Sequence, residues 1–75
     1  MYSITVPEIN AGKTLGDLLD EVAETDDFVS KMGAKYSFAS CIVTLDDKVI
    51  ARPARKSTVV NTGQSVKVFS VAFGG

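Results

Sequence analysis

The spacing of apolar residues changes along this chain, and that change limits what the chain can fold into. Leu15, Leu18, Leu19 and Val22 recur at intervals of about three to four residues, which is the period of a helix with one buried face. Elsewhere apolar residues alternate with polar ones, as at Tyr2, Ile4 and Val6, or crowd together, as in 65–72, which is typical of strands. A main helix laid across a sheet is one of the few architectures that a chain of 75 residues can complete.

The main helix is predicted over Leu15–Glu24. Thr14 is a favourable N-cap residue, and Asp17 stands where a negative charge suits the positive end of a helix. Gly16 weakens the helix slightly and is interpreted as a point of close packing against the sheet. A second, shorter helix is expected to begin at Asp26 or Asp27, to contribute Phe28 and Met32 to the core, and to end at Gly33.

Strands are expected on both sides of these helices. The predicted strands are Tyr2–Val6, Tyr36–Leu45, Val49–Ala51 and Ser65–Ala72, with turns at 46–47 and 61–64. In the second of them, alternation places Cys41, Val43 and Leu45 on one face and Phe38 and Ile42 on the other. We expect the first and last strands to lie side by side and parallel, which makes the sheet mixed.

Composition argues against several functions. The chain contains no histidine, no tryptophan and one cysteine, so it lacks the commonest general base and the usual ligands of a zinc site. Cys41 is expected to be a buried structural thiol, and a single cysteine, which cannot form an internal disulfide, fits a reducing cytoplasm. A net charge of −1 argues against a nucleic-acid partner. No apolar run suggests a membrane span or a secretory signal. An enzyme with a metal or catalytic residues of its own is therefore the least expected class.

Charge is distributed unevenly. Seven of the nine acidic residues lie between Glu8 and Asp27, whereas Arg52, Arg55 and Lys56 form a basic cluster later in the chain. This cluster is a candidate docking site for an acidic patch on a partner protein. The alternative is that these side chains are simply solvated.

The C-terminus carries the most specific signal. An apolar strand runs directly into Phe73-Gly74-Gly75. Glycine has no Cβ, so two glycines in succession suit a narrow channel in another protein. The prediction is one domain over 1–72, followed by a flexible tail over 73–75.

Three stretches make the chain resemble the sulfur carriers of thiamin and molybdopterin biosynthesis, the ThiS and MoaD families. They are 11–19, similar to the loop and helix entry; 43–53, similar to the hairpin; and 62–75, similar to the last strand and tail. The resemblance implies an α+β fold of the β-grasp, ubiquitin-like type, with a mixed sheet of four to five strands and one main helix across it. The segment before Ala11 is short for the two-stranded hairpin that opens this fold.

The resemblance also implies a chemistry for the tail. An adenylating enzyme uses ATP to activate the Gly75 carboxylate, and sulfur then replaces the adenylate to give a thiocarboxylate. Phe73 and Gly74 thread the partner's active site, and a biosynthetic enzyme accepts the sulfur. The carrier itself binds no cofactor, and ATP belongs to the partner.

Two other functions remain open. The chain is alternatively a protein modifier joined through Gly75 to lysines, because conjugation and sulfur carriage share the adenylation step. It is alternatively a non-covalent interaction module whose tail has no chemistry. The residues do not distinguish among thiamin synthesis, molybdopterin synthesis and a less common sulfur pathway.

Overall fold

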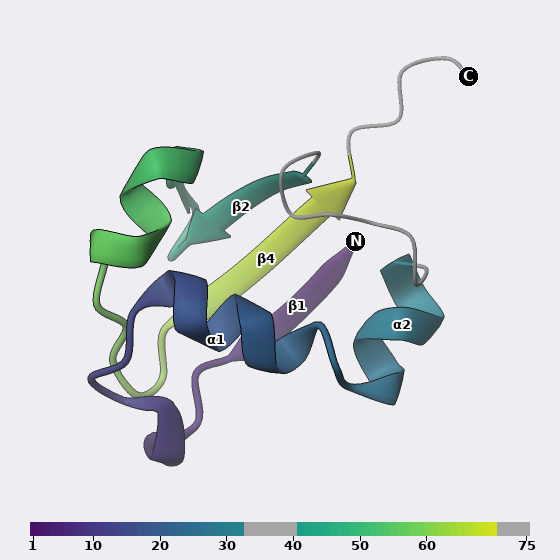
Figure 1. Cartoon of the computed structure of the whole chain (residues 1–75), viewed down its shortest axis with the longest axis horizontal. Helices are drawn as coiled ribbons and strands as arrows, with labels where there is room; N and C mark the ends of the chain where they lie inside the picture. Colours follow the sequence, from purple (N-terminus) through teal and green to yellow (C-terminus); the bar gives the residue numbers. More distant parts are fainter. Residues whose placement is uncertain (33–40, 71–75) are drawn as a thin grey trace.

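The computed structural model describes residues 1–32 and 41–70 of the chain. These residues form a four-stranded sheet of order β1-β4-β2-β3, with α1 lying across one face (Figure 1). The strands are β1 (Tyr2–Thr5), β2 (Cys41–Leu45), β3 (Lys48–Val49) and β4 (Ser65–Ser70), and the helices are α1 (Leu15–Val22), α2 (Asp26–Met32) and the 3₁₀ helices η1 (Glu8–Asn10) and η3 (Arg52–Ser57). The expected α+β architecture, with one main helix across a sheet, is confirmed.

Helix α1 begins where the sequence predicts. The Thr14 side chain accepts a hydrogen bond from the Asp17 backbone N–H at 3.2 Å, which caps the first turn. Leu15, Leu18, Leu19 and Val22 are all buried and belong to one apolar core with the sheet. The helix ends at Val22, slightly earlier than the predicted Glu24.

Gly16 has a different neighbour from the one predicted. A Cβ placed at Gly16 would lie 3.0 Å from Cδ of Lys56, so the close approach is made by a side chain of η3. The expectation that Gly16 packs against the sheet is wrong. The start of α1 is tied to the segment after η3 instead, since the Leu15 N–H donates to the Thr58 carbonyl at 2.7 Å.

Strand β4 is one of the two internal strands of the sheet and pairs with β1 on one side and β2 on the other. Val66 and Val68 point to the inner face, where both are fully buried. Across the sheet Val68 stands opposite Tyr2 and Val43, which are also buried. The alternation predicted for β2 is confirmed at the described positions, because Cys41, Val43 and Leu45 are buried and Ile42 is exposed.

The predicted direction of β1 is wrong. β1 lies beside β4 as expected, but Tyr2 pairs with Val68 and Thr5 with Ser65, so the two strands are antiparallel. The sheet is antiparallel throughout the described residues and not mixed. The reason is that only one strand precedes α1 within residues 1–32. The loop after that strand is bonded to Val60, through the Gly12 N–H and the Lys13 carbonyl, which brings the end of β1 to the start of β4.

The β2–β3 hairpin turns at Asp46-Asp47, as predicted. Both residues have positive φ, 49° and 66°, which is the geometry of a type I′ turn and the one that continues the strand twist. The Asp46 carboxylate accepts hydrogen bonds from the Ser65 N–H at 2.9 Å and from Gln64 Nε2 at 3.1 Å. The hairpin is therefore fastened to the start of β4. Strand β3 is shorter than the predicted Val49–Ala51.

Within residues 1–32 and 41–70, two elements were not predicted, and both are 3₁₀ helices. η1 follows Pro7, and η3 carries Pro53 in its first turn, where a missing backbone N–H costs little. Helix α2 is confirmed, and its Phe28 ring packs edge-on against Tyr2 at a centroid distance of 5.1 Å. The predicted helix end at Gly33, the strand over 36–40 with Phe38, and the side chain of Met32 lie outside the described residues.

The turn provides a test of backbone strain. Asp47 occupies left-handed backbone space that costs a residue with a Cβ roughly 1 kcal/mol or more. Asp47→Gly and Asp47→Ala both remove the exposed ion pair to Lys67, at 3.0 Å, and differ only in the Cβ. We expect the free energy of unfolding, measured by urea denaturation, to be about 1 kcal/mol higher for the glycine variant than for the alanine variant. Equal stability would contradict the turn geometry.

A second test concerns acid stability. The Glu21 carboxylate accepts hydrogen bonds from Lys13 Nζ at 2.8 Å and from Asn10 Nδ2 at 3.2 Å, and these lower its pKa below the ordinary value of 4.5. A lowered pKa in the folded state contributes stability that is present above pH 4.5 and is lost as pH falls through the folded pKa. We expect Glu21→Gln to flatten the loss of stability below pH 4.5, followed as the urea midpoint from pH 7 to about pH 3. If the urea midpoint of the variant falls with pH below 4.5 as steeply as that of the unaltered protein, the prediction is wrong.

Candidate functional site

The predicted tail leaves the central strand of the sheet. β4 ends at Ser70, and its last residues stay in register with β2, where Phe69 stands opposite Ile42 and Ser70 opposite Cys41. The strand is held at its start as well, because Gly63, at φ 87°, forms the turn and donates its N–H to the Val6 carbonyl at 3.0 Å. Whatever follows Ser70 therefore starts from a fixed point. Phe73, Gly74 and Gly75, the predicted reactive tail, lie outside the described residues.

The structure separates the predicted basic cluster. Arg55 is only 7% exposed, and its Nη2 donates to the Cys41 carbonyl at 3.0 Å. It therefore connects η3 to β2 and does not present its guanidinium on the surface. Arg52 is exposed, and Lys56 is exposed while forming ion pairs with Asp20 at 3.3 Å and Asp17 at 3.9 Å. The docking prediction is kept for Arg52 and Lys56 alone.

Burial shifts the pKa of two groups in the core of the described residues, Cys41 and Tyr2. Burial raises the pKa of the Cys41 thiol, and the nearby Arg55 charge offsets only part of that effect. Burial also raises the pKa of the Tyr2 hydroxyl. Both groups therefore keep their protons at neutral pH. Cys41 is 6% exposed, so the prediction of a buried thiol is confirmed.

Nowhere in residues 1–32 and 41–70 do three or more histidine, cysteine or acidic side chains gather closely enough to hold a metal ion. No helix in those residues has the length and apolar character needed to cross a membrane.

Comparison with known families decides the relationship. The model of the ThiS family matches residues 4–75. The chain belongs to the ThiS family. A search of curated proteins found no significant match. The family match covers all three stretches that carried the resemblance, 11–19, 43–53 and 62–75.

Membership in the ThiS family confirms the predicted fold type and the general role. ThiS-family proteins have the β-grasp fold and are small sulfur carriers, not enzymes, that work with activating and sulfur-accepting enzymes. In this member the sheet is antiparallel over the described residues, and a single strand precedes α1. The first strand of this sheet therefore runs opposite to the predicted direction.

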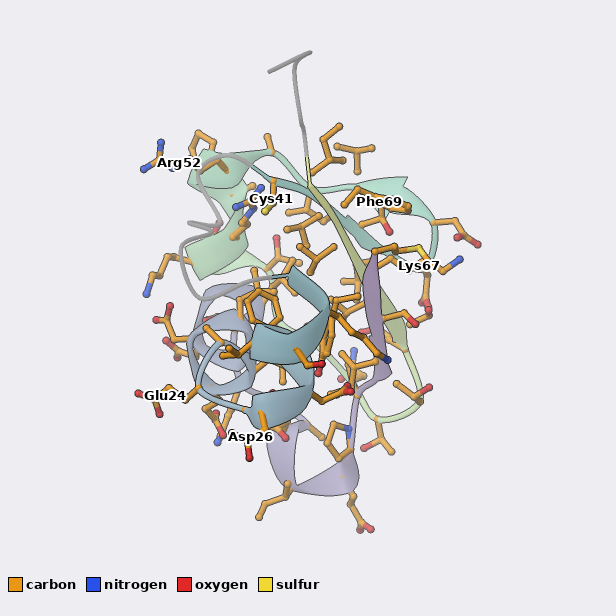
Figure 2. The ribbon with its side chains drawn as sticks, turned by 90° about the vertical axis from the view of Figure 1, so that its right-hand side faces the viewer. Glu24, Asp26, Cys41, Arg52, Lys67 and Phe69 are labelled. Atoms are coloured by element: carbon orange, nitrogen blue, oxygen red, sulfur yellow. The ribbon has the colours of Figure 1, made fainter. Side chains whose placement is uncertain are left out.

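One surface feature was not given a role from the sequence. Ile42 and Phe69 are exposed and directly opposite each other on the outer face of the sheet, which α1 does not cover. Figure 2 shows Phe69 and Lys67 on one side of β4 and Cys41 with Arg52 on the other. A signal existed in the sequence, since both strands have an apolar residue at a position that alternation assigns to the face opposite the core.

The placement of Arg55 can be tested against Arg52 in the same short helix. Arg55→Met removes a buried charged donor, and we expect a loss of about 2 kcal/mol in unfolding free energy. Arg52→Met changes an exposed side chain, so its free energy of unfolding should stay within about 0.5 kcal/mol of that of the unaltered protein. Urea denaturation of both variants measures the difference. Similar, small effects for the two would show that Arg55 is a surface residue.

Proposed function

We propose that this ThiS-family protein carries sulfur on its C-terminal carboxylate. A partner enzyme adenylates Gly75, sulfur replaces the adenylate, and the resulting thiocarboxylate donates sulfur in the biosynthesis of a cofactor or metabolite of the thiamin or molybdopterin type. The observation that carries the proposal is the family match, which extends through the Gly74-Gly75 ending. The single cysteine supports action in a reducing compartment, the cytoplasm.

The reaction needs two substitutions, and both occur in partner enzymes. In the first, a Gly75 carboxylate oxygen attacks the α-phosphorus of ATP, the bond to the β-phosphate breaks, and pyrophosphate leaves. In the second, sulfur at the oxidation level of sulfide attacks the acyl carbon and AMP leaves, which gives the thiocarboxylate. A persulfide donor would also need a thiol, to reduce the acyl disulfide formed on attack. The carrier's own contribution is the acyl group and its presentation.

The fold supports that presentation. Residues 71–75 follow directly after β4, and five residues of extended chain reach about 17 Å. This length allows the carboxylate to enter a site inside another protein while the domain stays outside. Glycines at the end pass through a narrow channel easily, but ordering them costs conformational entropy. Binding of the folded domain to the partner must offset that cost.

Intact-mass analysis of the protein purified from its source organism tests the proposal. We expect a species in which one oxygen has been replaced by sulfur, and we expect iodoacetamide to alkylate it. A variant lacking Gly75 is the control and should show neither the mass change nor the alkylation. In vitro, the cognate activating enzyme and ATP should produce the Gly75 adenylate.

Other outcomes would identify other functions. Isopeptide-linked adducts on lysines of other proteins, without free thiocarboxylate, would identify a protein modifier. Full function in cells after deletion of Gly75 would identify a non-covalent module. Failure of the cognate enzyme and ATP to give either adenylate or thiocarboxylate would contradict the proposed function.

A further inference from the structure

The two edge strands of the sheet, β1 and β3, differ in how they are protected against pairing with another strand. β3 is two residues long, includes the exposed Lys48 and follows the Asp46-Asp47 turn. A short, charged edge resists further pairing. β1 is four residues long, and residues 1–7 include no charged side chain. Within the described residues, β1 is therefore the edge of the sheet that is open to another strand.

The hydrogen bonds at the end of β1 show which of its backbone groups point outward. Both backbone groups of Val6 are bonded to the 63–64 turn that precedes β4, the N–H at 2.8 Å and the carbonyl at 3.0 Å. Along an antiparallel strand, the backbone groups of successive residues point to opposite sides. Ser3 and Thr5 therefore direct their N–H and carbonyl groups away from β4, toward the open edge.

The side chains at this edge are suited to contact with another strand. On the outer face, Ser3 and Thr5 are exposed and uncharged. On the inner face, Ile4 is half-buried, although Tyr2 and Val6 on either side of it are 3% and 1% exposed. Since β4 lies on the other side of β1, the uncovered part of Ile4 is apolar surface at the open edge. Figure 2 looks onto this edge and shows β1 beside α2 and not covered by it.

A second copy of the same edge meets all of these requirements. If a two-fold axis passes through Ile4, the two antiparallel β1 strands set Ser3 of each copy opposite Thr5 of the other. Each of these two pairs exchanges two backbone hydrogen bonds, which gives about four bonds in all. The two Ile4 side chains then stand opposite each other and cover their exposed surface. An uncharged strand also meets its own copy without electrostatic repulsion.

Pro7 and Ile4 favour this register over its neighbours. A shift in one direction sets Pro7 opposite Ser3 of the other copy, where proline has no N–H to donate. A shift in the other direction moves the two Ile4 side chains away from each other. The contact also closes on itself, because a two-fold pair uses the β1 edge of both copies and leaves only the short, charged β3 edges.

We propose that β1 is a self-association edge, through which two copies of this chain form a two-fold dimer with one continuous antiparallel sheet. This inference goes beyond the proposed function and does not depend on it. The two β4 strands of the dimer run in opposite directions, so the ends of β4 at Ser70 lie far from each other. Each copy therefore presents the end of β4 to a partner enzyme independently.

The size of the contact sets the strength of the dimer. One edge of four residues buries much less than the roughly 1,200 Å² at which stable interfaces begin. The dimer is therefore weak, and its population depends on protein concentration.

Two double variants at exposed positions test the pairing and its register. Ser3→Lys with Thr5→Lys sets lysines directly opposite each other in the dimer, where like charges repel. Ser3→Lys with Thr5→Glu is the matched control, because it places charges at the same two positions but sets a lysine opposite a glutamate. Circular dichroism and thermal melting verify that each variant is folded.

Sedimentation equilibrium of the full chain, from about 10 μM to about 1 mM, measures the association. We expect the unaltered protein to dimerise in this range and the double-lysine variant to have a dissociation constant at least tenfold higher. The lysine–glutamate variant should associate at least as tightly as the unaltered protein. Amide exchange followed by NMR locates the contact, since the Ser3 and Thr5 N–H groups should exchange more slowly as concentration rises.

Four results would overturn the inference. They are an unaltered protein that stays monomeric up to about 1 mM, equal association of the unaltered protein and the double-lysine variant, and equal weakening by both variants, which would exclude the antiparallel register. The fourth is Ser3 and Thr5 exchange that does not slow with concentration, and this measurement on the unaltered protein decides alone if a variant fails to fold. None of these results bears on the chemistry of Gly75, so the proposed function would stand.

Discussion

Strand β4 has a hydrogen-bonded partner on each side, and the position of every neighbouring element follows from it. β1 and β2 are aligned on it, the Asp46 carboxylate fastens the hairpin turn to its first residue, and α1 packs on the face that carries Val66 and Val68. A central strand with both edges paired is the part of a sheet least free to open. The predicted reactive tail therefore continues from one of the two strands that are paired on both edges.

The two faces of the sheet have different tasks. The inner face is apolar and closed by α1, so it supplies the stability that a domain of this size needs. The outer face is open, and its apolar residues gather near the end of β4, where Phe69 and Ile42 stand opposite each other. A small carrier that works with other enzymes needs a stable domain, and the core between α1 and the inner face supplies it.

Several charged side chains connect separate elements in the described part of the chain. Arg55 connects η3 to β2, and Lys56 connects η3 to Asp20 of α1. Lys13 and Asn10 both donate hydrogen bonds to the Glu21 carboxylate of α1. The clustering of Arg52, Arg55 and Lys56 in the sequence suggested a single basic docking surface. In the structure Arg55 turns inward, where its guanidinium donates a hydrogen bond to the Cys41 carbonyl, whereas Arg52 and Lys56 stay exposed.

The sequence by itself determined the elements whose signals are local. The capped period of α1, the Asp46-Asp47 turn, the start of α2 and the alternation that buries Cys41 were all predictable, because each depends on residues within about one or two turns or on the pleat of one strand. Tertiary structure decided the direction of β1, the burial of Arg55 and the approach of Lys56 to Gly16. Each of these depends on which distant segments meet: Tyr2 is paired with Val68 because the loop after β1 is bonded to Val60, and no local pattern specifies where a chain returns.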